Sequence, residues 1–351
     1  MIKKIVINGR IFEFPITGVG RFCYETIREL DKIIENDNNK WELALPIDAT
    51  NIPELKNIRV RVIGKATGII WEQITFPSYL RKTKSLALNM SNSIPLLHPD
   101  FAIIHDLNLK VNKNNLSSIF EKIKVQWPLL HYKIIAKKAK VIFTDSNYQK
   151  KEIIQAYGVN ESRICVTYPG WEHMNSIIED DNILERYSLK RGEYYFAVST
   201  RAKNKNFKWI VDVSKNNKQS LFVIAGKLET KYFSDKVSML ERNIITTGYI
   251  SDGEMKALMR NCKAFIYPST YEGFGIPPLE ALSVGAKVFV SDSSCLPEVY
   301  NDCAYYISPY DSHVDLDMLL SRPIEKPRKL LDKYSWEITA KNIYRSINQF
   351  E

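Results

Sequence analysis

Two patterns of apolar positions alternate along most of the chain. Short apolar runs, typical of buried strands, are followed by stretches in which apolar residues recur every three or four positions, typical of amphipathic helices. This alternation predicts parallel α/β sheets covered by helices. The predicted strands are 4–8, 41–46, 60–63, 85–90, 102–105, 141–144, 163–167, 194–198, 221–225, 244–247, 264–267, 287–291 and 304–307. The main predicted helices are 18–36, 116–138, 146–157, 206–215, 251–260 and one that follows Pro278.

An interruption of this rhythm divides the chain in two. Tyr168-Pro-Gly170 and the acidic stretch after it predict a linker near 168–190, beyond which the alternation resumes. Since 351 residues can form two full cores, we expect two domains, 1–169 and 170–333. Each should be a doubly wound sheet that binds ligands at the carboxyl ends of its strands.

The last segment, 334–351, has the pattern of an amphipathic helix. The apolar residues expected along one side of it are Trp336, Ile338, Ile343 and Ile347. The sequence alone allows this helix to pack on either domain.

The composition narrows the class of protein. Apolar residues make up 45% of the chain and charged residues 25%, which is ordinary for a soluble globular protein. The five cysteines are odd in number and lack Cys-x-x-Cys spacing, which favours reduced thiols in a cytoplasm over a disulfide framework or a zinc site. The first apolar run lacks a small-residue cleavage site and is predicted to be a strand rather than a signal peptide. No run reaches the roughly 18 apolar residues that a membrane span needs.

The net charge of +9 is concentrated in the first half of the chain. Residues 1–169 hold 25 Lys and Arg against 16 Asp and Glu, whereas residues 170–351 hold 24 of each. The densest part, 110–151, has ten lysines against two acidic residues. The aromatic residues interleaved with these lysines are Phe120, Trp127 and Tyr132. A helix with lysines outward and aromatic rings at the headgroup level can lie on an anionic membrane surface, and a solvated lysine face is the alternative. No nucleic-acid motif accompanies the patch, so nucleic acid is not expected as a partner.

The strongest motif of the chain is the stretch 268–282. It begins where the predicted strand 264–267 ends, and its two prolines belong in the first turn of a helix. Gly273 and Gly275 leave the turn without side chains, so a ligand can approach the backbone. A glycine turn that leads into a helix N-terminus offers free N–H groups and the positive end of the helix dipole, which suits a phosphate.

Glu272 and Glu280 flank this predicted anion site. Because a diphosphate repels a carboxylate, each is better suited to accept hydrogen bonds from the hydroxyls of a sugar or a ribose. The stretch resembles the Glu-x7-Glu signature of the family-four retaining glycosyltransferases, whose GT-B fold has two doubly wound, Rossmann-like α/β domains facing a central cleft. The resemblance implies that Glu272 lies by the donor sugar and that Glu280 binds the ribose hydroxyls. It also implies that the terminal helix crosses back to the N-terminal domain. The donor-binding residues expected in the turn itself are Gly273, Phe274, Gly275 and Ile276.

Two elements of the first domain are also similar to that family. Gly18-Val-Gly20-Arg21 follows the first strand and opens a helix, and a simple turn into a helix is the even alternative. The resemblance places Gly18 and Gly20 against the donor phosphates, where Arg21 can add charge. His105 ends the strand 102–105, and the resemblance makes it a contact of the donor sugar near the reacting carbon. Asp106 can orient its ring or cap a turn. The histidines to which the sequence assigns no role are His98, His131 and His313.

Basic residues follow the first strand of the second domain. In the resembled family a lysine at this place neutralises the diphosphate leaving group, and Lys205 occupies the matching position. Ser199-Thr200 replaces the usual glycine and arginine, so Arg201 is expected to supply the second charge from a shifted position. A basic helix start without an anion is disfavoured, because its charge opposes the helix dipole.

Two further elements have open interpretations. Gly170 fits the family's turn at the domain junction, and Trp171 and His173 are equally suited to face the cleft or to hold the linker. The element 71–77 also occurs in part of the family and lies in the domain that receives the acceptor, with a core helix as its equal alternative.

Together these features predict a retaining glycosyltransferase, a hexosyl- or deoxyhexosyltransferase, with catalytic residues His105, Glu272 and Lys205. It is expected to move a sugar from a nucleoside-diphosphate sugar to a hydroxyl of a glycan or lipid-linked saccharide, in bacterial surface polysaccharide synthesis. No cofactor and no metal are expected, since the chain lacks an Asp-x-Asp motif and cationic side chains must take the place of a divalent ion. The expected location is the cytoplasm, or the inner face of the cell membrane. The alternatives are a GT-B sugar-nucleotide epimerase and a non-catalytic nucleotide-sugar-binding protein.

Overall fold

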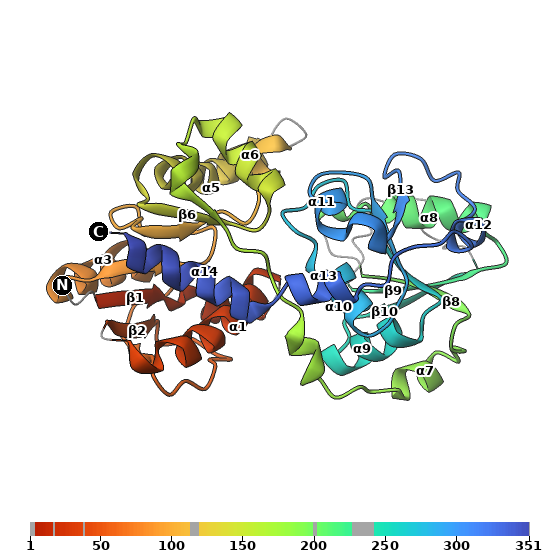
Figure 1. Cartoon of the computed structure of the whole chain (residues 1–351), viewed down its shortest axis with the longest axis horizontal. Coiled ribbons are helices and arrows are strands. Elements are labelled where there is room, and N and C mark those ends of the chain that lie inside the picture. The colour runs from red at the N-terminus through yellow and green to blue at the C-terminus, as the bar shows by residue number, and fades with distance from the viewer. Residues whose placement is uncertain are drawn as a thin grey trace. The chain divides into compact units, whose positions relative to one another are not determined.

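The described residues form two compact α/β units (Figure 1). The computed structural model describes residues 4–16, 18–37, 39–112, 119–198, 202–226 and 242–350. Unit 1 lies within residues 1–170 and 335–351, and unit 2 within residues 171–334. The stretch expected to be a linker, 168–190, is therefore part of unit 2 from Trp171 onward, because it folds into short helical turns there.

Unit 1 contains a sheet in which seven described strands are all parallel, in the order β3-β2-β1-β4-β5-β6-β7. The strands are β1 (Lys4–Asn8), β2 (Lys40–Leu45), β3 (Arg59–Val62), β4 (Leu86–Asn89), β5 (Phe101–Ile103), β6 (Val141–Thr144) and β7 (Ile164–Val166). After β3 the chain returns to the other side of β1, so the switch point of this sheet lies between β1 and β4.

Helices cover the sheet of unit 1. They are α1 (Gly18–Ile33), α2 (Gly68–Ile70), α3 (Phe76–Thr83), α4 (Asn108–Val111), α5 (Ile119–Lys138), α6 (Asn147–Tyr157) and α14 (Trp336–Gln349). The terminal helix α14 lies beside α1, where the ring of Trp336 meets Phe22 edge-on at 5.8 Å, and Tyr344 stacks on Trp41 at 6.2 Å (Figure 1). Ile343 and Ile347 are buried as expected, but Ile338 is 41% exposed, because Ala340 rather than Ile338 continues the buried face.

Unit 2 repeats the plan with six described parallel strands in the order β10-β9-β8-β11-β12-β13. The strands are β8 (Tyr194–Val198), β9 (Leu221–Ala225), β10 (Ile244–Gly248), β11 (Ala264–Tyr267), β12 (Val288–Ser291) and β13 (Tyr305–Ile307). The helices are α7 (Asn182–Arg186), α8 (Phe207–Asn216), α9 (Asp252–Asn261), α10 (Ile276–Ser283), α11 (Leu296–Tyr300), α12 (Leu316–Leu320) and α13 (Arg328–Lys333). The switch point of this sheet lies between β8 and β11.

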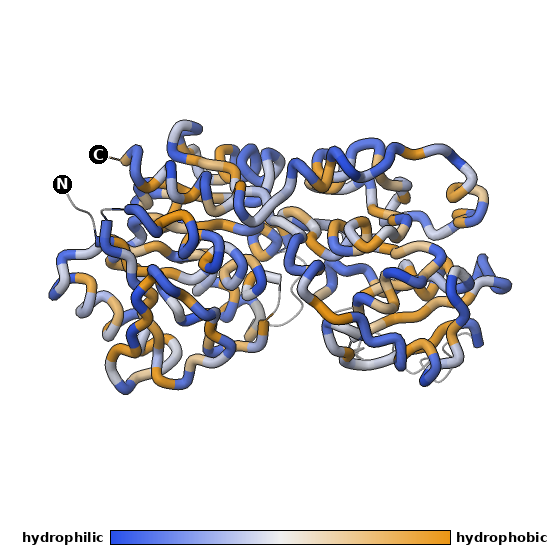
Figure 2. The backbone as a smooth tube through the Cα atoms, turned by 60° about the horizontal axis from the view of Figure 1, so that its bottom comes forward, coloured by the Kyte–Doolittle hydropathy of each residue, from blue (hydrophilic) through white to orange (hydrophobic). Residues whose placement is uncertain are grey.

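Most strands are apolar because helices cover both faces of each parallel sheet, whereas the edge strand β3 (RVRV) is largely exposed. Apolar stretches run through the interior of each unit, and polar stretches lie mainly on the connections (Figure 2). All four residues of β11 and all four of β12 are buried. Each of the thirteen predicted strands is present among the described residues, with ends shifted by no more than one residue at most places. The prediction of two doubly wound sheets is therefore confirmed.

Candidate active site

The glycine turn of unit 2 has a backbone that only glycine adopts easily. Gly275 lies at φ +93° as the residue that precedes α10, and a Cβ built on it would lie 2.7 Å from Cδ2 of Leu296. The hydroxyl of Tyr300 donates a hydrogen bond to the Gly275 carbonyl, which holds the turn in place. No side chain caps α10. Pro277 and Pro278 have no N–H, so the donors that the start of this helix can offer a phosphate are the backbone N–H groups of Ile276 and Leu279. Phe274 is buried and meets the ring of Tyr334 edge-on at 5.2 Å.

Lys205 and Glu272 meet at the switch point of unit 2. Lys205 ends the helical turn that follows β8, and Glu272 follows β11. The ammonium of Lys205 donates to Glu272 Oε1 at 2.8 Å and to the hydroxyl of Tyr267 at 2.6 Å. The same ammonium lies 4.9 Å from the centre of the Tyr267 ring. Burial, together with the charge of Glu272, raises the pKa of Tyr267 well above its usual value, so this phenol stays neutral.

This arrangement changes the explanation of the basic residues after β8. We expected Lys205 to be tolerated there only because of an anionic ligand. The structure gives its charge a partner within the chain, the carboxylate of Glu272, at a lysine that is about one-fifth exposed. Arg201, the second expected cation, lies outside the described residues.

Glu280 lies in the first turns of α10 and is 7% exposed. Its Oε1 lies 2.9 Å from Nε2 of His173, which is itself buried in the turn that follows Trp171. The indole of Trp171 donates to the carbonyl of Leu331 at 2.9 Å. The sequence left the roles of Trp171 and His173 open, and the structure makes His173 the residue that holds one oxygen of Glu280 in place.

His105 of unit 1 is held at both ring nitrogens. Nδ1 lies 2.9 Å from Asp145 Oδ2, and Nε2 lies 3.0 Å from the carbonyl of Met90. Burial alone lowers the pKa of His105, but the charge of Asp145 and the hydrogen bonds to Asp145 and Met90 outweigh it and raise that pKa. Since the Met90 carbonyl can only accept, Nε2 donates to it, and the raised pKa of the ring favours a second proton on Nδ1, between the ring and Asp145.

The carboxylate that orients His105 is therefore Asp145, which follows β6, and not the adjacent Asp106. Asp106 caps a turn by accepting from the backbone N–H of Asn108 at 2.8 Å. Sequence reasoning missed Asp145 because it lies 40 residues from His105 in the chain, and the two meet only because β5 and β6 are neighbours. The signal that was present is that His105 ends one predicted strand and Asp145 follows the next one in the chain.

The glycines of the first loop lie in open surroundings. A Cβ on Gly18 would meet nothing within 4 Å, and one on Gly20 would have its nearest neighbour at 3.8 Å. The fold itself therefore does not demand glycine at either position. Arg21 lies 3.6 Å from Glu25, a partner for its charge within α1.

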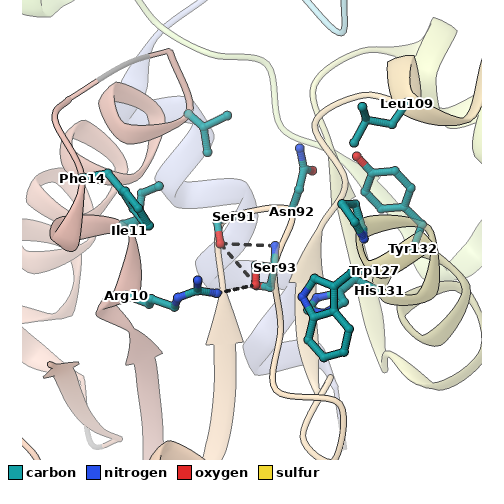
Figure 3. A pocket seen from close by; sticks show the side chains of 12 residues that line it. Arg10, Ile11, Phe14, Ser91, Asn92, Ser93, Leu109, Trp127, His131 and Tyr132 are labelled. Atoms are coloured by element: carbon teal, nitrogen blue, oxygen red, sulfur yellow. Dashed lines mark hydrogen bonds between the residues drawn. The ribbon is translucent and has the colours of Figure 1, made fainter. Parts of the chain in front are cut away.

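A cavity of about 320 Å³, which no sequence motif predicted, lies at the switch point of unit 1 (Figure 3). It is lined by residues after β1, residues after β4, and the helices α1, α4 and α5. These residues are Arg10, Ile11, Phe14, Val19, Ser91, Asn92, Ser93, Leu109, Trp127, Pro128, His131 and Tyr132. One signal in the sequence marks part of this lining: Arg10 and Ser91–Ser93 follow predicted strands.

Residues of the element 71–77 make hydrogen bonds that hold the segments around this cavity in place. The carboxylate of Glu72 is fully buried and accepts from Arg10 at 2.7 Å and from the hydroxyl of Ser93 at 2.5 Å. Gln73 donates to the carbonyl of Ile94 at 2.9 Å and accepts from the N–H of Leu96 at 3.1 Å. The sequence left open whether this element is a core helix or takes part in the acceptor domain's site. Trp71 is buried, as in a core helix, while Glu72 and Gln73 hold the segments that line the cavity through hydrogen bonds.

Among the described residues, no group of three or more His, Cys, Asp and Glu side chains is placed to hold a metal ion. In the same part of the chain, no helix combines the length and apolarity that crossing a bilayer requires.

Sequence and structure comparisons identify the class. The family "Glycosyl transferases group 1" matches residues 179–334, which lie in unit 2. The O-antigen chain mannosyltransferase B of Escherichia coli is 25% identical over 341 residues, covering 88% of this chain and 87% of that protein. The O-antigen chain mannosyltransferase RfbU of Salmonella typhimurium is 28% identical over 240 residues, covering 65% of this chain and 62% of that protein. The structure of a sucrose-phosphate synthase from Thermosynechococcus elongatus superposes with a TM-score of 0.67 at 13% identity, covering 99% of this chain and 94% of that one.

These matches, with the two parallel-sheet units, define a glycosyltransferase with the GT-B fold. Residues 179–334 carry its group 1 glycosyl transferase region. The predictions of the enzyme class and of the fold are thereby confirmed.

Proposed function

We propose that this glycosyltransferase moves a hexose, with retention and without a metal, from a nucleoside-diphosphate sugar to a hydroxyl of a glycan or lipid-linked saccharide. The observation that carries the proposal is the set of groups at the switch point of unit 2. An uncapped helix N-terminus behind Gly275, the ammonium of Lys205 and the buried carboxylate of Glu280 all lie in segments that follow β8 or β11, the two strands at this switch point. The N–H groups and the ammonium can donate hydrogen bonds to a diphosphate, and the carboxylate can accept hydrogen bonds from hydroxyls.

The chemistry needs two charges to be stabilised. In the proposed reaction the acceptor oxygen bonds to the anomeric carbon on the face from which the diphosphate departs, and the acceptor proton passes to the departing phosphate. Lys205 and the N–H groups of α10 stabilise the negative leaving group, and Arg201 is proposed to assist. Glu272 and His105 position the sugar, and Glu280 accepts from the ribose. A covalent sugar trapped on a carboxylate would contradict this same-face route.

The sugar and the setting are proposed from the relatives. Two of them are O-antigen chain mannosyltransferases, from Escherichia coli and Salmonella typhimurium. Mannose is therefore the first sugar to test, and a bacterial surface polysaccharide or its lipid-linked precursor is the first class of acceptor.

We also propose that unit 1 binds an anionic membrane surface through the basic segment 110–151. In the described part of α5, exposed apolar side chains are spaced three or four residues apart, so they share one side of the helix. They are Phe120, Ile123, Trp127 and Leu130. The exposed lysines of the same helix are Lys122, Lys124, Lys133, Lys137 and Lys138. Tyr132, which we expected at the headgroup level, is instead 1% exposed and faces the cavity, because it lies on the core side of α5.

The test is thermal stabilisation by UDP, GDP, dTDP and ADP, measured on the wild type and on Glu280→Gln. The Gln side chain keeps an oxygen for His173 and removes the charge. A nucleotide at about 100 times its dissociation constant adds roughly 2.7 kcal/mol to the free energy of unfolding. We expect one nucleotide to stabilise the wild type, Glu280→Gln to respond much less, and the exposed-site control Glu193→Gln to respond like the wild type.

The matching nucleotide sugars are then supplied with and without a saccharide acceptor. Transfer that requires the acceptor, with the donor's anomeric configuration kept in the product, supports the proposal. Conversion of the donor alone to an epimer would identify a sugar-nucleotide epimerase. Tight donor binding without any turnover would identify a binding protein.

A further inference from the structure

The cavity of unit 1 lies where a doubly wound sheet binds its ligand. Its residues follow β1 and β4, the two strands between which the strand order reverses. Its volume of about 320 Å³ is at the lower end of the range of small-molecule sites, roughly 300–1,000 Å³. The same loop reaches His105, since the backbone N–H of His105 donates to Asn92 Oδ1 at 3.0 Å and its ring bonds to Met90. A ligand in the cavity therefore lies next to a residue proposed for the reaction.

The walls of the cavity are aromatic and its base is polar. Figure 3 shows Phe14 on one side, Trp127 and Tyr132 on the other, and the serines of the β4 loop between them. The hydroxyl of Tyr132 points across the cavity toward Asn92 (Figure 3). Burial raises the pKa of Tyr132, so this hydroxyl keeps its proton and can donate it in a hydrogen bond. Apolar faces with a few convergent hydrogen-bonding groups are the lining that a sugar ring requires.

The cavity carries no uncompensated charge. Among the described residues that line it, Arg10 is the one member of the Lys, Arg, Asp and Glu group. Its guanidinium is paired with Glu72 at 2.7 Å and lies 3.5 Å from Glu13. Glu72 also accepts from Asn8 at 3.4 Å and from Gln73 at 3.2 Å, so its own charge is satisfied below the cavity. An anionic or cationic ligand would thus find no free counter-charge there.

His131 adds a neutral polar group to this lining. Burial lowers its pKa, and its Nδ1 accepts from the backbone N–H of Ile94 at 2.9 Å. The ring proton therefore resides on Nε2, which is buried and has no hydrogen-bond partner among the described residues. The rings of Trp127 and His131 meet edge-on, with their centroids 4.7 Å apart. Trp127 is 37% exposed, so its indole can be reached by a molecule in the cavity.

We propose that this cavity is the site of the acceptor's sugar residue, and that it selects an uncharged hexose. The inference rests on the proposed function, because it names the acceptor class of that reaction. Trp127 and Phe14 pack on the ring, and the hydroxyls of Tyr132 and Ser91 with the amide of Asn92 bond to the sugar hydroxyls. Glu72 acts as a positioning residue, because it holds Arg10 and Ser93 and touches no ligand itself.

The experiment uses the full chain and ligand-observed saturation-transfer NMR. The neutral probes are methyl α-mannopyranoside and methyl α-glucopyranoside, the charged probes are glucuronate and glucosamine, and octanol is an apolar probe. The variants are Trp127→Ala and Tyr132→Phe. The matched control is Tyr310→Ala, which removes an aromatic ring that is 82% exposed in unit 2.

We expect the neutral probes to bind the wild type and Tyr310→Ala alike. Binding should weaken about tenfold in Trp127→Ala, which corresponds to about 1.4 kcal/mol, and severalfold in Tyr132→Phe. Nucleotide stabilisation should persist in both variants, since the proposed donor site lies in unit 2, and a circular dichroism spectrum and unfolding curve like those of the wild type show that unit 1 folds. Neutral probes that bind both variants as tightly as the wild type would overturn the site. Glucuronate or glucosamine binding as tightly as the hexosides, or octanol displacing them, would overturn the proposed ligand class.

The outcomes separate this inference from the function on which it rests. Hexoside binding that depends on Trp127, in a protein that turns over no nucleotide sugar, would support the cavity as a sugar site and refute the proposed transferase reaction. Sugar transfer from a donor to an acceptor at a rate that Trp127→Ala does not change would support the reaction and refute the cavity as the acceptor site.

Discussion

The ammonium of Lys205 lies 2.8 Å from Glu272 Oε1, although 67 residues separate them in the chain. They meet because β8 and β11 are parallel neighbours, and each residue follows the carboxyl end of its strand. The pair keeps a cation and a carboxylate together in a site that is only partly exposed, which lowers the cost of holding either charge there. In the proposed reaction the diphosphate would be a second anion for the same ammonium, which Tyr267 also holds.

Lys205→Ala should reduce kcat by roughly 10²–10³-fold, because a preorganised cation is lost from the departing diphosphate. Lys208→Ala is the control, since Lys208 belongs to the same helical region but is 83% exposed and pairs only with Asp212. Initial rates of sugar transfer at saturating donor measure both. A Lys205→Ala enzyme with wild-type kcat would remove this lysine from the mechanism.

Gly275→Ala should lose more stability and more nucleotide binding than Gly285→Ala. Both glycines have φ above +90°, so alanine at either costs about 1–3 kcal/mol of backbone strain. A Cβ on Gly275 also meets Leu296 at 2.7 Å, whereas one on Gly285 meets nothing within 4 Å. Denaturant unfolding and nucleotide-induced thermal shifts measure the difference. Equal effects at the two positions would show that the contact with Leu296 contributes neither to stability nor to nucleotide binding.

The stability that His105 provides should fall as the pH rises. Its pKa is raised in the folded state, so folding binds a proton more tightly, and this contribution is complete below the usual value of about 6.5. It is lost as the pH passes the raised, folded-state pKa. Burial raises the pKa of Asp145 as well, which acts in the same direction at lower pH.

The measurement is the difference in Tm between the wild type and His105→Gln from pH 6 to 9. We expect the advantage of the wild type to shrink toward high pH, with His98→Gln as the control, because His98 lies 3.9 Å from Asp100 at a more exposed place. An advantage that is independent of pH would mean that the ring at position 105 carries no extra proton.

The triple variant Lys133→Glu, Lys137→Glu, Lys138→Glu should bind vesicles that contain anionic lipid at least tenfold more weakly, since each lysine near such a surface contributes about 1 kcal/mol. Nucleotide stabilisation should not change, because these exposed lysines lie in unit 1. The control with the same change in net charge is Lys190→Glu, Lys215→Glu, Lys218→Glu in unit 2. Equal loss of vesicle binding in both triples would leave no specific role for α5.

The fold was predictable from the sequence because its signals are local. Buried parallel strands such as 264–267 are short apolar runs, and the turns between them are marked by Gly, Pro and polar residues. The helix predicted at 251–260 is present as α9, and Ser251 and Glu254, three residues apart, form a capping box at its start. The glycine turn at 273–275 was recognisable for the same reason, since its strand, glycines and prolines are contiguous.

The partners within the site were decided by tertiary structure alone. Which carboxylate holds His105 and which acid pairs with Lys205 depend on which strand ends become neighbours, over separations of 40 and 67 residues. Which ring holds Glu280 depends on the packing of the turn that contains His173 against α10, over a separation of 107 residues. No sequence motif marks the cavity lined by Arg10, Ser93 and Trp127, because its walls come from five separate segments whose spacing in the chain is set by loop lengths. Sequence determined the elements and the chemistry at their ends, and the order of the strands determined which of those ends meet.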